Sequence, residues 1–100
     1  PTVVLVADPH LADYSGYSPY NIGSTAAQDA YTQALRNVAA LYPTGEVIVV
    51  DANSGWTPAT MVSSDDVHPN DRGAAKIAAT VADALMALDY RNGCQLVSLT

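Results

Sequence analysis

The chain has 100 residues, of which 49% are hydrophobic and 14% are charged, and its formal net charge is −6 at pH 7. This composition is typical of a packed globular chain and excludes an intrinsically disordered one. With only four lysine and arginine residues, the chain is poorly suited to bind nucleic acid or an anionic membrane surface, and no apolar run is long enough to span a bilayer. We expect a neutral or weakly charged substrate.

The first predicted element is a strand over residues 2–7, where a continuous apolar run rich in β-branched residues ends at Asp8-Pro9. Such a run is typical of a strand buried on both faces of a parallel sheet. Residues 10–23 are rich in Ser, Gly, Tyr, Pro and Asn, and we expect them to form a long surface loop.

A helix is predicted from Thr25 to Tyr42, because apolar residues recur there at helical spacing and Pro43 stops the pattern. Thr25 and Gln28 form the pattern of a capping box at its start. The predicted apolar face consists of Ala27, Tyr31, Leu35, Val38 and Tyr42.

A second buried strand is predicted over residues 46–51, which completes a right-handed strand–helix–strand unit. Residues 52–70 are predicted to form a loop, and a last helix is predicted from Asp71 to about Tyr90 with Asn70 as its cap. The predicted apolar stripe of this helix consists of Ala74, Ile77, Ala78, Val81, Leu85 and Leu88, whereas Lys76, Thr80 and Asp83 are expected to face solvent.

The fold class expected from this order is α/β, but two doubly apolar strands and two helices do not complete a parallel sheet. We therefore expect residues 1–100 to be the C-terminal portion of a single domain. The N-terminal half would be a separate chain or a further segment of the same polypeptide.

The strongest functional signal is the run Asp-Asp-Val-His-Pro-Asn at residues 65–70. It places Asp65 three residues before His68, on a loop ahead of a helix and after a strand. Open α/β sheets carry their active sites at the carboxyl ends of their strands. A carboxylate that accepts from one ring nitrogen orients the imidazole and stabilises its charged form, so that the other nitrogen can act as a general base toward a hydroxyl nucleophile.

In its Asp-x-x-His-Pro-Asn form, this run resembles the C-terminal signature of the SGNH (GDSL) hydrolase superfamily of esterases and lipases. The resemblance covers the chain from Thr2 to about Leu88. It implies the C-terminal part of a flavodoxin-like three-layer α/β/α sheet, and ester hydrolysis without a metal or organic cofactor. His68 would be the base and Asp65 its orienting acid, with Asp66 as the rival to Asp65.

The other motifs of that superfamily do not occur in these residues: the serine in Gly-Asp-Ser, the oxyanion-hole glycine, and the asparagine in Gly-x-Asn-Asp. We therefore expect the nucleophile and the oxyanion hole on the missing N-terminal half. Ser15-Gly16 and Ser54-Gly55 are the nearest substitutes in the chain, but neither is predicted on a sharp strand-to-helix turn.

Residues 50–56 and 68–71 most resemble the carbohydrate acetyl esterases of the superfamily, which implies O-acetyl groups on carbohydrate as substrate. Trp56 is a candidate wall of the substrate cleft, and the alternative is a loop anchor packed on the core. Low lysine content with many Ala, Thr, Ser and Asp residues is compatible with a secreted protein. Cys94, the single cysteine, either pairs outside this segment or is a buried thiol.

Two other classes of function compete with an esterase. Asp65, Asp66, His68 and Asp71 supply potential metal ligands, although their spacing matches neither a typical Ca²⁺ loop nor a typical Zn²⁺ site. The second competitor is an interaction module that has kept the fold and lost the chemistry, because the nucleophile is missing from these residues.

Overall fold

The computed structural model describes residues 2–16 and 20–91. Its elements are β1 (Val3–Ala7), the 3₁₀ helix η1 (Tyr20–Ile22), α1 (Thr25–Ala39), β2 (Val47–Asp51), α2 (Pro58–Met61) and α3 (Asp71–Arg91). Cys94 lies outside the described residues.

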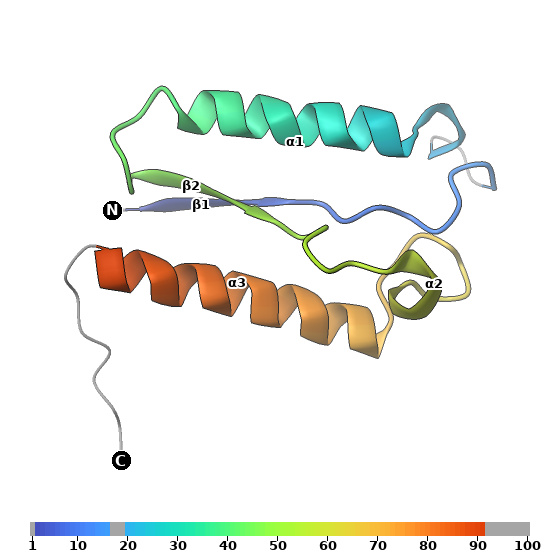
Figure 1. Ribbon diagram of the computed structural model, residues 1–100. Coiled ribbons are helices and arrows are strands. Elements are labelled where there is room, and N and C mark those ends of the chain that lie inside the picture. The colour runs from blue at the N-terminus through green and yellow to red at the C-terminus, as the bar shows by residue number, and fades with distance from the viewer. Residues whose placement is uncertain (1, 17–19, 92–100) are drawn as a thin grey trace, which may run out of the picture.

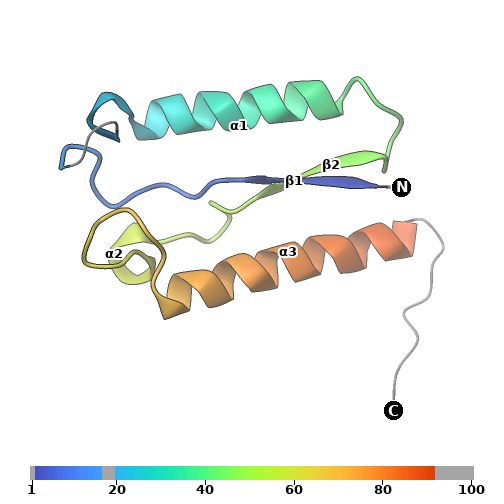
Figure 2. The same ribbon diagram turned by 180° about the vertical axis from the view of Figure 1, so that it is seen from behind.

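The two strands form a parallel sheet, which confirms the α/β class. The register pairs Val3 with Val47 at one end and Ala7 with Asp51 at the other. Helix α1 covers one face of this sheet and α3 covers the other, so that the molecule has three layers (Figures 1 and 2). Both strands point toward the end of the molecule where α1 and α3 begin (Figure 1).

Helix α1 begins at Thr25 as predicted, but it differs from its prediction in its cap, its C-terminal end and its orientation. Its N-cap is Ser24, whose hydroxyl accepts from the Ala27 N–H at 3.0 Å, so the predicted capping box at Thr25 is wrong. The helix ends at Ala39 rather than Tyr42. The buried residue of α1 is Thr32, whose hydroxyl donates to the Gln28 carbonyl at 3.1 Å.

The predicted apolar face of α1 is largely exposed: Tyr31 is 75% exposed, Val38 47% and Tyr42 51%. Thr32 is the buried residue of this helix, whereas its neighbour Tyr31 is exposed. An exposed row of this kind is typical of a surface that another part of a fold covers.

Helix α3 is also rotated from its predicted orientation. Leu88 is buried and Ile77 and Val81 are half-buried, as predicted, but Ala74, Ala78 and Leu85 are exposed. Lys76 and Thr80, which were expected to face solvent, are half-buried. The Thr80 hydroxyl donates to the Lys76 carbonyl at 2.9 Å, and the end of the Lys76 side chain lies beside the turn at Gly55.

The core of the described part is small. Its buried apolar residues are Ala7, Val50, Ala52 and Leu88. The expectation that β1 is buried on both faces is wrong for this chain, since Val3 is 51% exposed and Val6 is 43% exposed. The reason is that β1 has β2 as its one neighbour in the described sheet. No helix of the described residues is sufficiently long and apolar to cross a membrane.

Candidate active site

The candidate site lies at the carboxyl ends of the strands, at the end of the molecule where α1 and α3 also begin (Figure 1). The loop that bears His68 is closed at its base by a bridge between Val62 and Pro69. Within it, the Ser63 N–H donates to the His68 carbonyl at 2.7 Å, and the Asp66 N–H donates to the Ser63 carbonyl at 3.0 Å. These bonds give the loop one defined backbone path.

Asp65 and His68 form the predicted pair. The imidazole Nδ1 lies 2.5 Å from Asp65 Oδ2, while Asp65 Oδ1 accepts from the backbone N–H groups of Val67 and His68, each at 2.9 Å. One carboxylate thus holds both the ring and the loop. With Nδ1–H donating to the carboxylate, Nε2 carries the lone pair and is the atom able to accept a proton.

The ring is open to an incoming group. The His68 side chain is 75% exposed and that of Asp65 is 40% exposed. Among the described residues, no serine, threonine or tyrosine hydroxyl makes a hydrogen bond with this ring. The Ser15 hydroxyl donates to Asp13 at 2.7 Å instead, and Ser54 lies in the exposed turn after β2.

The carboxyl group of Asp65 is unusually acidic. Its hydrogen bond with the His68 side chain, and then its bonds from the His68 and Val67 N–H groups, lower its pKa from 3.8 to about 2. All three stabilise the carboxylate relative to the acid. Asp65 therefore carries its charge throughout the pH range in which an imidazole exchanges protons.

This shift predicts how the loop responds to acid. Because the pKa in the folded state lies below the unfolded value, the stabilising contribution of Asp65 is fully present above about pH 4 and is lost as the pH falls through about 2. We expect the ¹³C resonance of the Asp65 carboxyl group to titrate with a midpoint near 2, and the midpoint to rise in His68→Ala. An unchanged midpoint in that variant would show that the ring does not contact the carboxylate.

Asp66, the rival candidate, contributes through its backbone. It has a φ of 64°, a left-handed conformation that Asp and Asn tolerate better than other side chains with a Cβ. Its carbonyl accepts from the Ala12 N–H at 3.1 Å. The geometry pairs His68 with Asp65, as the spacing predicted.

Asn70 joins the loop to α3 and confirms its predicted role as the cap. Its Oδ1 accepts from the Gly73 N–H at 2.9 Å, and its Nδ2 donates to the Thr60 carbonyl at 2.9 Å. Its own N–H donates to the Met61 carbonyl at 3.0 Å. The end of α2 and the start of α3 are thereby tied together directly beside His68.

Gly73 is required by this joint, and a methyl group there should disturb it. A Cβ at Gly73 would lie 2.1 Å from the Met61 carbonyl oxygen and 2.9 Å from Cη2 of Trp56. We expect Gly73→Ala to lower the free energy of unfolding by about 1–3 kcal/mol, measured by thermal unfolding of the natural polypeptide or complex. Gly16→Ala is the matched control, because a Cβ at Gly16 meets nothing within 4 Å. Equal melting temperatures for the two variants would contradict the close approach.

A groove of about 550 Å³ runs past the His68 ring. This volume lies within the range of small-molecule sites. Its walls come from the segment after β1, from the start of α1, from the His68 loop and from α3; the lining residues that matter here are Asp8, Pro9, Tyr14, Gln28, Tyr31 and His68. Asp8 and Pro9, which follow the first strand, both line it.

Trp56 is not among the residues that line the groove. Its indole Nε1 donates to the His10 carbonyl at 3.0 Å, and its ring is half-buried close to Gly73. These contacts are those of the loop anchor that the sequence offered as the alternative. Direct contact with substrate remains a prediction.

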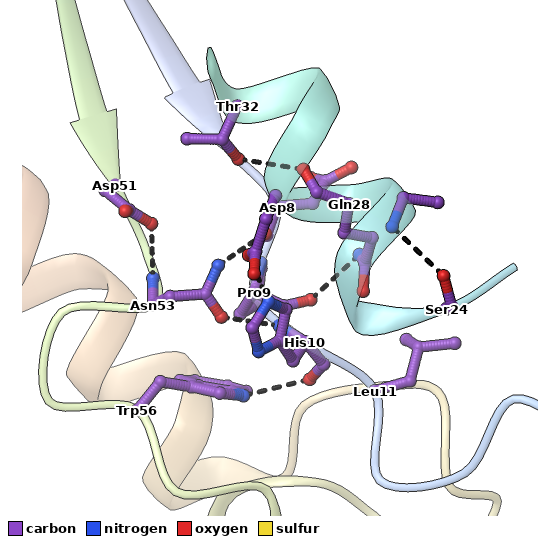
Figure 3. A network of polar contacts seen from close by, with 12 residues as sticks. Asp8, Pro9, His10, Leu11, Ser24, Gln28, Thr32, Asp51, Asn53 and Trp56 are labelled. Carbon is purple, nitrogen blue, oxygen red and sulfur yellow. Dashed lines mark hydrogen bonds and ion pairs between the residues drawn. The ribbon is translucent and has the colours of Figure 1, made fainter.

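Two residues of the site were missed by sequence reasoning. Asn53 and Gln28 both hold the segment after β1, as shown in Figure 3. The signal available for Asn53 was its place two residues beyond the end of a strand, where Asn commonly bonds to nearby backbone. Gln28 was predicted to belong to a capping box, and no local pattern indicates that its Nε2 donates to the Pro9 carbonyl.

The second histidine pairs with a carboxylate elsewhere. His10 Nε2 lies 2.7 Å from Asp29 Oδ1, and this pair joins the segment after β1 to α1. Over the described ranges 2–16 and 20–91, no three His, Cys, Asp or Glu side chains are grouped to hold a metal ion. The structure thus gives the metal-binding alternative no support.

Comparisons with known proteins found no matching family model, no matching curated protein and no matching solved structure.

Proposed function

We propose that this chain supplies the acid and base of a serine esterase of the SGNH type. The observation that carries the proposal is the 2.5 Å contact between His68 Nδ1 and Asp65 Oδ2 on the rim of a groove. That contact orients the ring with Nε2 free to act as a base, the arrangement required to activate a hydroxyl nucleophile.

The proposed reaction is the transfer of an acyl group to water. A serine hydroxyl from the N-terminal half attacks the ester carbonyl while His68 Nε2 takes its proton. His68 then returns the proton to the departing alcohol, and the acyl-enzyme is released by a water molecule that His68 activates in the same way. Asp65 stabilises the imidazolium in both steps. Backbone donors on the N-terminal half hold the oxyanion.

The proposal of an N-terminal half rests on the exposed surface of β1. Helix α1 packs on both strands, whereas α3 packs on β2, so β1 is the strand with less cover. Val3 and Val6 are exposed on it, and Tyr31 of α1 is exposed nearby. Further parallel strands beside β1, giving a flavodoxin-like three-layer sheet, would cover these side chains and deliver their own carboxyl ends to the groove.

This arrangement predicts that residues 1–100 alone do not unfold cooperatively as a monomer. The reason is that a sheet with two strands and four buried apolar residues over the described ranges 2–16 and 20–91 buries too little surface to offset the chain entropy. Urea unfolding followed by circular dichroism, with the mass checked by sedimentation, is the measurement. A sharp transition of the monomer would remove the need for a second half.

The proposed substrates are O-acetyl groups on carbohydrate, and the proposed location is outside the cell. The support for the substrate is the resemblance of residues 50–56 and 68–71 to carbohydrate acetyl esterases. The support for the location is the low lysine content with many Ala, Thr, Ser and Asp residues. The test compares the rate of acetate release from acetylated xylan with the rate of fatty-acid release from long-chain lipid esters. We expect the first rate to be higher. Faster hydrolysis of the lipid esters would overturn the carbohydrate assignment and leave the esterase intact.

The esterase itself is tested on the natural polypeptide or complex that contains this chain, isolated from its source. We expect a fluorophosphonate probe to label one serine outside residues 1–100, and the label to abolish acetyl ester hydrolysis. Absence of both labelling and hydrolysis would instead favour an interaction module that retains the fold without the chemistry.

A further inference from the structure

We infer that Asn53 is a positioning residue that acts on the His68 loop through the strap, the name used here for residues 8–12. This inference rests on the proposed function for its catalytic consequence, but its structural content is independent of it. The strap joins β1 to the loop that follows and has no regular secondary structure. It nevertheless lines the groove at Asp8, Pro9 and Leu11.

Asn53 clamps the strap on both sides of Pro9. Its Oδ1 accepts from the His10 N–H at 2.7 Å, and its Nδ2 donates to the Asp8 carbonyl at 3.2 Å. Asn53 is itself fixed, because its N–H donates to Asp51 Oδ1 at 2.9 Å at the end of β2. Figure 3 shows the Asn53 side chain reaching from the end of β2 to the strap.

Two further side chains complete the attachment. Trp56 Nε1 donates to the His10 carbonyl at 3.0 Å, and Gln28 Nε2 donates to the Pro9 carbonyl at 3.3 Å (Figure 3). The donors come from the loop after β2 and from α1, so the strap is tied to both elements that flank it. A segment with this many satisfied backbone groups has little freedom to shift.

The strap is hydrogen-bonded to the His68 loop. The Ala12 N–H donates to the Asp66 carbonyl at 3.1 Å. That carbonyl belongs to the peptide whose N–H, on Val67, donates to Asp65. Since Asp66 is held in a left-handed conformation, the orientation of this peptide is not one that the chain adopts by preference. The strap bond therefore helps to hold the geometry of the Asp65–His68 pair.

The primary test is Asn53→Ala in the natural polypeptide or complex, with Asn37→Ala as the matched control. Asn37 is exposed on α1 and makes its side-chain bond to Gln33. We expect Asn53→Ala to lower kcat roughly 10–100-fold with KM changed little, because a misplaced base costs the chemical step more than substrate binding. We expect Asn37→Ala to leave kcat unchanged.

The spectroscopic readout is the carboxyl titration of Asp65, which needs no activity. In Asn53→Ala its midpoint should rise from about 2 toward 3.8, as the bonds from Val67 and His68 loosen. A lower melting temperature with unchanged kcat and an unchanged Asp65 midpoint would overturn the inference, since Asn53 would then be merely structural. If the wild-type protein hydrolyses no ester, the proposed function fails, while the midpoint still decides the coupling.

Trp56→Phe provides a second variant, in which a smaller aromatic ring replaces the indole and the donor to His10 is removed. We expect kcat to fall roughly 2–10-fold and the Asp65 midpoint to rise by less than in Asn53→Ala. No change in either quantity would contradict the route through the strap. A rise in KM alone would instead place Trp56 in the substrate cleft.

Discussion

Replacing His68 with alanine in the complete proposed esterase is expected to reduce kcat by about 10⁴–10⁶-fold. In the proposed reaction, the variant lacks the atom that would take the proton from the nucleophile and return it to the leaving alcohol. Since the His68 side chain is 75% exposed and its ring bonds to Asp65 alone among the described residues, its removal should change stability little. Steady-state kinetics on an acetyl ester and the melting temperature give the two measurements.

His10→Gln is the control for this variant, because the chain has two histidines and both pair with an aspartate. The His10 ring bonds to Asp29 and does not line the groove. We expect its loss to lower kcat only a few-fold, because it removes one tie between the strap and α1 while the proposed base is kept. Near-normal turnover in His68→Ala, or an equal loss in His10→Gln, would refute the assignment of the base.

Asp65→Asn is expected to lower kcat by about 10⁴-fold while the loop keeps its shape. The amide oxygen can still accept from the Val67 and His68 N–H groups. The amide nitrogen, however, donates to His68 Nδ1, which drives the ring proton to Nε2 and removes the lone pair that a general base needs. Ring ¹⁵N chemical shifts should therefore report the opposite tautomer from the wild type.

Asp66→Asn separates this effect from the loss of any neighbouring charge. Asparagine tolerates the φ of 64° at this position, and the Asp66 bonds to Ala12 and Ser63 are made by the backbone. We expect kcat and the tautomer to remain those of the wild type. Loss of turnover in Asp66→Asn with normal turnover in Asp65→Asn would reverse the assignment of the two carboxylates.

The sequence predicted best where structure is decided locally. The order strand, helix, strand, helix follows from apolar runs and helical spacing, and the four elements lie within a few residues of their predicted bounds. The Asp65–His68 pair was predictable for the same reason, because the two residues are three apart and a loop readily folds a carboxylate onto the following turn.

Features decided by packing were predicted poorly. The faces of α1 and α3 were assigned from hydrophobicity, yet Thr32 is buried and Lys76 is half-buried while Tyr31 is exposed. Polar residues with short-range hydrogen bonds enter such positions at little cost. The four-residue helix α2 was assigned to a loop because one turn carries no periodicity. The strap contacts join residues 43 and 46 positions apart, which no local pattern reveals.

The short spacing of Asp65 and His68 has a consequence for control of the proposed enzyme. Both side chains belong to one loop that is closed by its own backbone hydrogen bonds. We therefore expect the two side chains to move together. A hinge or loosening between this chain and the half that carries the serine would change the distance from nucleophile to base without disturbing the base itself. Separation of the two halves would then switch the proposed enzyme off, and their closure would switch it on again, while the Asp65–His68 pair stays formed.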